Sequence, residues 1–220
     1  FVLDSNIEVS GIKDNVMIGR VGGSGSKSRS ETFAVIEDLL EFASSLNLKD
    51  MESYKDIADL IGDSPIAESM DLHPRDIKAL YNLVNNDLPL IINANRASDL
   101  LKLIDLKLKY NLNLIIMGAQ EAGLVADKIA KNNIPLIINP INNIPESFDE
   151  LAANIELAAY LENQGITLMF NAPRSHNFHL IRQGAGVAVA NGMSYAGALR
   201  ALTSSPEEVF NLGDRGEIVS

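Results

Sequence analysis

The feature that most restricts the fold of this chain is a repeated alternation of short Ile/Leu runs with helix-forming stretches. The runs are LPLIIN (88–93), LNLIIM (112–117), IPLIIN (134–139) and ITLMFN (166–171). Helical patterns follow over 98–110, 121–132 and 147–163, and a fourth begins near His176 or Asn177. Continuous apolar runs are typical of strands buried on both faces of a parallel sheet. The alternation therefore predicts an α/β protein with four βα units.

Two of the predicted helices carry one apolar stripe each, with the spacing of a helix that packs on a sheet. The stripes consist of Leu100, Leu101, Ile104 and Leu108 in one helix and of Leu151, Ile155, Ala158 and Ala159 in the other. Further on, SYAGALRAL predicts a helix from Ser194. A last helix is expected with Ser205 as N-cap, Pro206 as first residue and Gly213 as stop signal, and a strand then begins in RGEIVS.

The N-terminal third is less regular. We expect a strand over 15–21, the Gly/Ser loop GGSGSKSRS (22–30), a helix over 31–45, and loop with short helix over 46–75. The loop lacks the Gly directly before Lys that a phosphate-binding loop requires, so a surface loop is favoured. Lys27 and Arg29 are still candidates to meet an anionic ligand.

Composition narrows the class of protein. The chain has 220 residues, of which 46% are hydrophobic, which is enough for a sizeable core. No apolar run reaches the roughly 18 residues that a membrane span needs, and a net charge of −11 argues against a nucleic-acid partner. The absence of cysteine excludes disulfides and Cys-ligated metals but leaves both cytoplasmic and periplasmic locations open.

Polar residues follow the predicted strands at the edge where parallel α/β folds bind ligands. Three of the four runs end in Asn, at Asn93, Asn139 and Asn171. The remaining run, 112–117, is followed closely by Gln120 and Glu121. Asn is also common at turns and helix caps, so each position alone fits a structural role. Together with neighbouring polar residues they predict a pocket that binds a small molecule. The neighbours are Asn95, Arg96, Arg174 and His176.

A metal site is a weaker prediction. His176 and His179 have the spacing that places two imidazoles on one helical face. Two ligands do not complete a site, and a capping or solvent-facing role suits this pair better.

The order of these segments resembles the second half of the catalytic barrel of the amidohydrolase superfamily, in its imidazolonepropionase-related branch. The resemblance rests on PLIINANRASDLL (89–101), on 111–170, and most specifically on RQGAGVAVANGMSYAGALRALTSSPEEVFNLGDRGEI (182–218). It implies a parallel (β/α)8 TIM barrel of which this chain covers about strands 5–8 and the C-terminal helices. Residues 1–75 would belong to the preceding barrel region, 76–215 to βα units, and 216–220 to the return into a small β-sandwich domain.

The resemblance implies a hydrolase that acts on carbon–nitrogen bonds other than peptide bonds. In that family one or two divalent ions activate a water molecule, and an Asp on strand 8 takes its proton. The strand-5 His position matches Asn93, the strand-6 position falls in MGAQE (117–121), and the strand-8 Asp position matches Asn171 or Ala172. We therefore take Asn171 and His176 as candidate catalytic residues and expect a degenerate metal site.

Amides take up no proton at neutral pH and bind Zn²⁺ weakly. Two alternatives follow: a single divalent metal such as Zn²⁺ held mainly by residues outside this chain, or a non-catalytic binding protein on the same barrel. Because half a barrel exposes two strand edges, we expect it to pack against the missing half or against a second copy. A doubly wound binding domain is a third, less favoured alternative.

Overall fold

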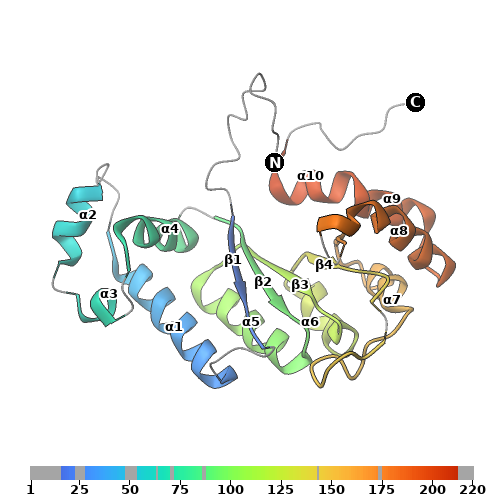
Figure 1. Ribbon diagram of the computed structural model, residues 1–220, viewed down its shortest axis with the longest axis horizontal. Helices are drawn as coiled ribbons and strands as arrows, with labels where there is room; N and C mark the ends of the chain where they lie inside the picture. Colours follow the sequence, from blue (N-terminus) through green and yellow to red (C-terminus); the bar gives the residue numbers. More distant parts are fainter. Residues whose placement is uncertain are drawn as a thin grey trace.

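The computed structural model describes residues 16–22, 28–47, 54–62, 64–69, 72–85, 88–142, 144–172 and 175–212. They form an α/β fold around one sheet of five parallel strands (Figure 1). The strands are β1 (Met17–Arg20), β2 (Leu90–Ala94), β3 (Leu114–Gly118), β4 (Leu136–Ile138) and β5 (Leu168–Phe170). All four predicted Ile/Leu strands are present, and β1 lies within the strand predicted over 15–21.

The strands pair in the order in which they occur along the chain. Ile92 of β2 pairs with Gly19 of β1 and with Ile116 of β3, and the parallel ladder continues through β4 to β5. A doubly wound fold has a reversal of strand order, and this sheet has none. β2 and β4 begin directly after Pro89 and Pro135, because proline has no N–H to donate to a ladder.

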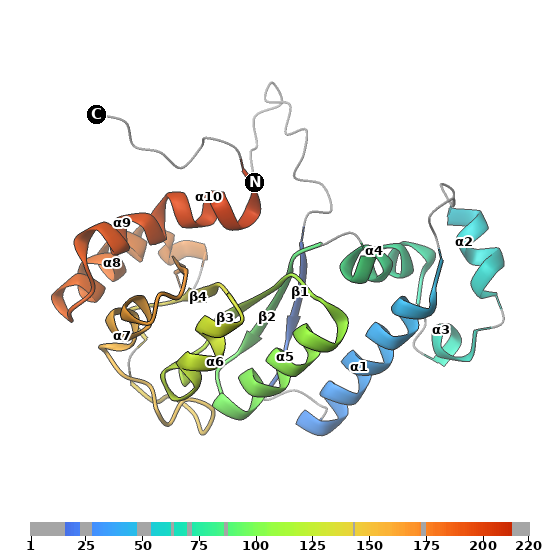
Figure 2. The ribbon, with the colours of Figure 1, turned by 180° about the vertical axis from the view of Figure 1, so that it is seen from behind.

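Figure 2 shows α5 (Ala97–Tyr110) and α6 (Ala126–Lys131), two of the helices between strands, covering one face of the sheet. The main core joins this face to residues of α1 (Arg29–Ser45), α5, α6 and α7 (Leu157–Asn163). On the opposite face Ile91, Ile115 and Met169 pack with Val209 and Phe210 of α10 (Ser204–Phe210). The strands are therefore apolar on both faces, as continuous Ile/Leu runs predict.

The remaining helices lie at the two ends of the molecule (Figure 1). On one side are α2 (Tyr54–Ile61), α3 (Pro65–Ser69) and α4 (Pro74–Asn85). On the other side are η2 (Ser175–Leu180), α8 (Ile181–Ala190) and α9 (Tyr195–Leu202). A short 3₁₀-helix, η1 (Ala122–Val125), directly precedes α6. The domain boundary expected after residue 75 stays a prediction, and α4 runs across that position. The expected stop signal Gly213 and residues 216–220, expected to begin the return into a β-sandwich, lie outside the described residues. No helix in the described ranges is long and apolar enough to cross a membrane.

Three expectations about helices are corrected. The predicted helix over 147–163 is helical only from Leu157, because 147–156 forms turns. The last helix begins at Ser204 with Thr203 at the cap position, and the predicted cap Ser205 is a buried residue within the helix. The segment after Ser175 starts as a 3₁₀-helix and becomes α-helical at Ile181.

The predicted apolar stripes are also only partly buried. In α5, Leu100 and Ile104 are buried, but Leu108 is 63% exposed and Leu103 and Leu106 are buried instead. Leu151 and Ile155 are 62% and 42% exposed, because their segment is not part of a helix that packs on the sheet.

We predict that Leu100→Ala lowers the free energy of unfolding by about 2 to 5 kcal/mol, since it leaves a cavity where the side chain is fully buried. Leu108→Ala, in the same helix, is the matched control and should change stability by less than about 0.5 kcal/mol. Urea unfolding of both variants measures this, and similar losses would contradict the assigned buried face of α5.

Candidate functional site

The polar residues predicted at the strand ends do gather along one edge of the sheet. Asn93 lies in β2, in register with Arg20 of β1 and Met117 of β3. Asn139 and Asn171 directly follow β4 and β5, whose last residues pair with each other, and the Asn171 N–H donates to the Ile138 carbonyl at 3.0 Å. Parallel pairing thus places these three carboxamide residues along the same edge of the sheet.

Four of the predicted carboxamide residues contain a buried polar atom that lacks a hydrogen-bond partner in the described part of the chain. These atoms are Asn95 Oδ1, Gln120 Oε1, Asn139 Nδ2 and Asn171 Oδ1. Buried polar atoms in native proteins almost always have a partner, which can be a bound water or ligand. Their concentration at the strand ends marks this edge as a place where a polar molecule would be stabilised.

Two of these side chains have a fixed orientation. The Asn95 Nδ2 group donates to Glu150 Oε1 at 2.7 Å, which leaves Oδ1 as the unpaired atom. Asn139 Oδ1 accepts from the Ile141 N–H at 3.2 Å, which leaves Nδ2 as an unpaired donor. The edge therefore offers both an acceptor and a donor.

A polar cavity of about 250 Å³ lies at the ends of β1 and β2. Asn93 and Asn95 line it together with Arg20, and Ser147, Asp149 and Glu150 close it from the segment after β4. Arg20, Ser147, Asp149 and Glu150 were not predicted as site residues. The carboxylates looked like the solvent-facing side of a predicted helix, and Arg20 looked like the end of a strand.

An ion-pair network holds this part of the structure together. Arg29, the first residue of α1, donates to Asp99 Oδ2 at 3.0 Å and also pairs with Asp149. The hydrogen bond with Asp99 is the main cause that raises the pKa of the Arg29 guanidinium above its ordinary value. Arg29 therefore joins α1, α5 and the segment after β4. Lys27 lies outside the described residues.

Glu121 has a structural role in this geometry. One carboxylate oxygen accepts from the Ala97 N–H at the start of α5 at 2.9 Å, and the other from the Ala152 N–H at 3.4 Å. With both oxygens engaged and the residue 8% exposed, Glu121 is already satisfied within the chain. Its predicted contact with a substrate stays a prediction.

Gly118 is required at the end of β3. Its φ is +89°, which favours glycine, and a Cβ at this position would collide with Asn95 Oδ1. The next residue, Ala119, also has a positive φ of 52°. This turn therefore allows Asn95 to lie close to the backbone of β3 and determines the position of Gln120.

Of the other predicted site residues, none lines this cavity among those described, which are Arg96, Gln120, Glu121, Asn139 and Asn171. Arg96 is exposed at the start of α5. Arg174 and the side chain of His176 lie outside the described residues, so their roles and the predicted His pair remain predictions. His179 is exposed and its ring contacts Phe178.

The donor chemistry at this edge does not fit a divalent transition metal. Asn93 and Asn171, which the resemblance would place at ligand positions, are carboxamides, and these bind Zn²⁺ weakly compared with imidazole or carboxylate. Within the described ranges no three His, Asp or Glu side chains are grouped as metal ligands. We therefore assign no metal ligands here.

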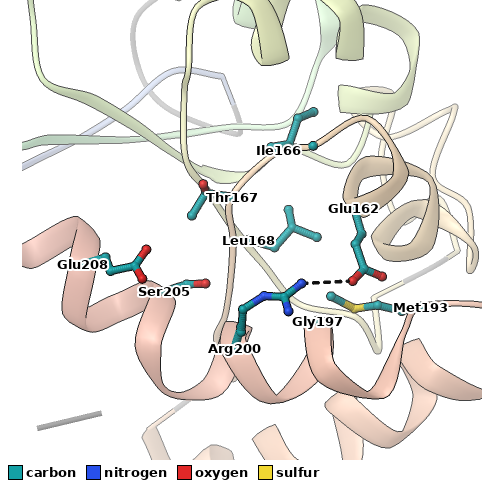
Figure 3. Close-up of a pocket in the computed structure, with 10 residues that line it drawn as sticks. Glu162, Ile166, Thr167, Leu168, Met193, Gly197, Arg200, Ser205 and Glu208 are labelled. Carbon is teal, nitrogen blue, oxygen red and sulfur yellow. Dashed lines mark ion pairs between the residues drawn. The ribbon is translucent and has the colours of Figure 1, made fainter. Parts of the chain in front are cut away.

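A second cavity, of about 210 Å³, lies at the opposite end of β5 (Figure 3). Glu162 of α7 lines this cavity. Its carboxylate accepts a hydrogen bond from the Ser194 N–H at 2.8 Å and lies 3.6 Å from Arg200 Nη2. Any side chain at Gly197 would collide with the Glu162 carboxylate. Glu162 therefore serves to join α7 to the start of α9.

Comparisons with known proteins support the fold. No protein-family model matches the chain, and no curated protein matches it. Among solved structures, the crystal structure of an amidohydrolase from Thermotoga maritima is similar with a TM-score of 0.70 at 18% sequence identity. The match covers 91% of this chain and 53% of that protein, so the chain spans about half the length of the amidohydrolase. At this identity the likeness establishes the fold alone.

We predict that Gly118→Ala lowers the free energy of unfolding by about 1 to 3 kcal/mol, because it adds a collision with Asn95 to an unfavourable φ. Gly165→Ala is the matched control, since Gly165 also has a positive φ, of +74°, but open space around its Cβ position. Thermal or urea unfolding should show a clearly smaller loss for Gly165→Ala. Equal losses would mean that Asn95 does not approach Gly118 as described.

Proposed function

We propose that this chain is part of an amidohydrolase-type barrel and that its strand-end edge binds a small, polar, amide-containing molecule. The observation that carries the proposal is the set of buried, unpaired carboxamide atoms at Asn95, Gln120, Asn139 and Asn171. A ligand that offers both N–H and C=O groups would satisfy these acceptors and this donor.

The barrel assignment draws support from the sheet. The five strands are parallel, follow chain order and carry their βα helices on one face, as consecutive strands of a (β/α)8 barrel do. The four strands β2 to β5 would be the barrel's fifth to eighth, and β1 the fourth. The likeness to an amidohydrolase crystal structure agrees with this arrangement.

We further propose that the missing half of the barrel, or a second copy of the chain, covers the edge at β1. Ile18 of β1 is 66% exposed, although it lies on the same face as the buried Ile91 with which it pairs. An apolar cavity of about 210 Å³ opens between β1 and α1. A further strand and helix would bury both features.

Two activities are compatible with this site. Hydrolysis of a carbon–nitrogen bond other than a peptide bond is favoured by the likeness to an amidohydrolase. Binding without catalysis is favoured by the carboxamides, which hold a ligand by hydrogen bonds but take up no proton. In both cases we assign Asn93, Asn95, Gln120, Asn139 and Asn171 to ligand recognition.

We predict that a hydantoin-type or linear amide probe raises the thermal unfolding temperature of the wild-type protein. Asn139→Ala and Asn171→Ala should remove this rise, because each removes part of the unpaired polar row. Asn163→Ala, at an exposed position of α7, is the control and should keep it. Equal rises in all four proteins would reject the proposed site.

Metal analysis and an amide-hydrolysis assay of the intact protein separate the two activities. Stoichiometric divalent metal together with turnover of the bound amide would establish the hydrolase, with its metal held by residues outside the described ones. Ligand binding with neither metal nor turnover would establish the binding protein.

A further inference from the structure

The segment after β4 contains the signals of a helix start, although it does not form a helix. Ser147 and Glu150 have the spacing of a capping box, in which Ser caps the helix and Glu occupies its third position. The Ser147 hydroxyl already accepts from the Asp149 N–H at 3.2 Å. Single turns follow, with Glu150 N–H donating to Ser147 O and Ala153 N–H donating to Glu150 O, yet α7 begins only at Leu157.

The apolar side chains of this segment face outward. Phe148, Leu151 and Ile155 are separated by three or four residues, which is the spacing of one side of a helix. They are 84%, 62% and 42% exposed. Apolar packing therefore does not hold the segment in its observed position.

Polar contacts with residues far away in the sequence hold it instead. Asp149 pairs with Arg29, Glu150 accepts from Asn95, and the Ala152 N–H donates to Glu121. The same segment supplies Ser147, Asp149 and Glu150 to the wall of the 250 Å³ cavity. It crosses the end of the sheet toward which the strand arrows point (Figures 1 and 2).

We propose that residues 147–156 are a lid with two arrangements. In the closed arrangement, the one observed, Asp149 and Glu150 hold turns across the cavity. In the open arrangement the segment is helical and continuous with α7, so that Asp149 and Glu150 leave the cavity wall.

The physical reason is a conflict between local and distant interactions. The capping box and the apolar spacing favour a helix, in which Leu151 and Ile155 would lie on the same side as Ala158 and Ala159. Contacts with residues more than twenty positions away favour the turns. The role of the lid in ligand entry rests on the proposed function, whereas the two arrangements themselves do not.

Asn95→Ala tests the proposal without changing the helix propensity of the lid, because it removes the partner of Glu150 from outside the segment. We expect the ¹³Cα chemical shifts of 148–156 to move toward helical values, and adding Ala153→Gly should reverse the change. A reporter for opening is Val21→Cys, a buried cavity residue in a chain that has no cysteine. Its reaction with a thiol reagent should accelerate at least about fivefold in the Asn95→Ala background.

The wild-type protein provides a second measurement in case Asn95→Ala fails to fold. Raising NaCl weakens partly exposed ion pairs such as that between Arg29 and Asp149, so the same chemical shifts should move toward helical values with salt. Unchanged shifts in both experiments, or a change to random-coil values, would overturn the lid. A lid that switches in a protein that binds no amide probe would overturn the proposed function alone.

Discussion

The parallel pairing of five strands in chain order determines where the helices and the candidate site lie. Because every strand runs in the same direction, every carboxyl end meets the same edge of the sheet. Asn93, Asn139 and Asn171 are far apart in the sequence and become neighbours along that edge for this reason. The position of the candidate site is therefore a consequence of the sheet, and the helices on one face serve to make the parallel connections.

The second determinant is the polar network above that edge. Arg29 joins the starts of α1 and α5 to the segment after β4, and Glu121 binds backbone amides of both α5 and the same segment. These contacts bring Asp149 and Glu150 to the cavity. They also leave the apolar side chains of the segment at the surface. Hydrophobic burial alone would favour the opposite arrangement, with these side chains inside.

Much of the fold could be predicted from the sequence, because uninterrupted Ile/Leu runs identify buried parallel strands with little ambiguity. The carboxamide row followed from where those runs end. The turns at 147–156 could not be predicted, since their local pattern favours a helix and the contacts that override it come from Asn95, Glu121 and Arg29. For the same reason Asp149 and Glu150 were not recognised as cavity residues. The helix α4 was missed although its sequence displays it, since Ile77, Leu80, Tyr81 and Val84 have the spacing of one helical face. The start of α10 at Ser204 depends on packing that a single sequence does not display.

The buried, unpaired carboxamide atoms at the strand ends are, in our proposal, positions for a bound polar molecule. A high-resolution crystal structure of the intact protein would test this through the density around Gln120 Oε1 and Asn139 Nδ2. We expect an ordered ligand or water within hydrogen-bond distance of both atoms. Protein groups paired with both of them, leaving no space at the edge, would contradict it.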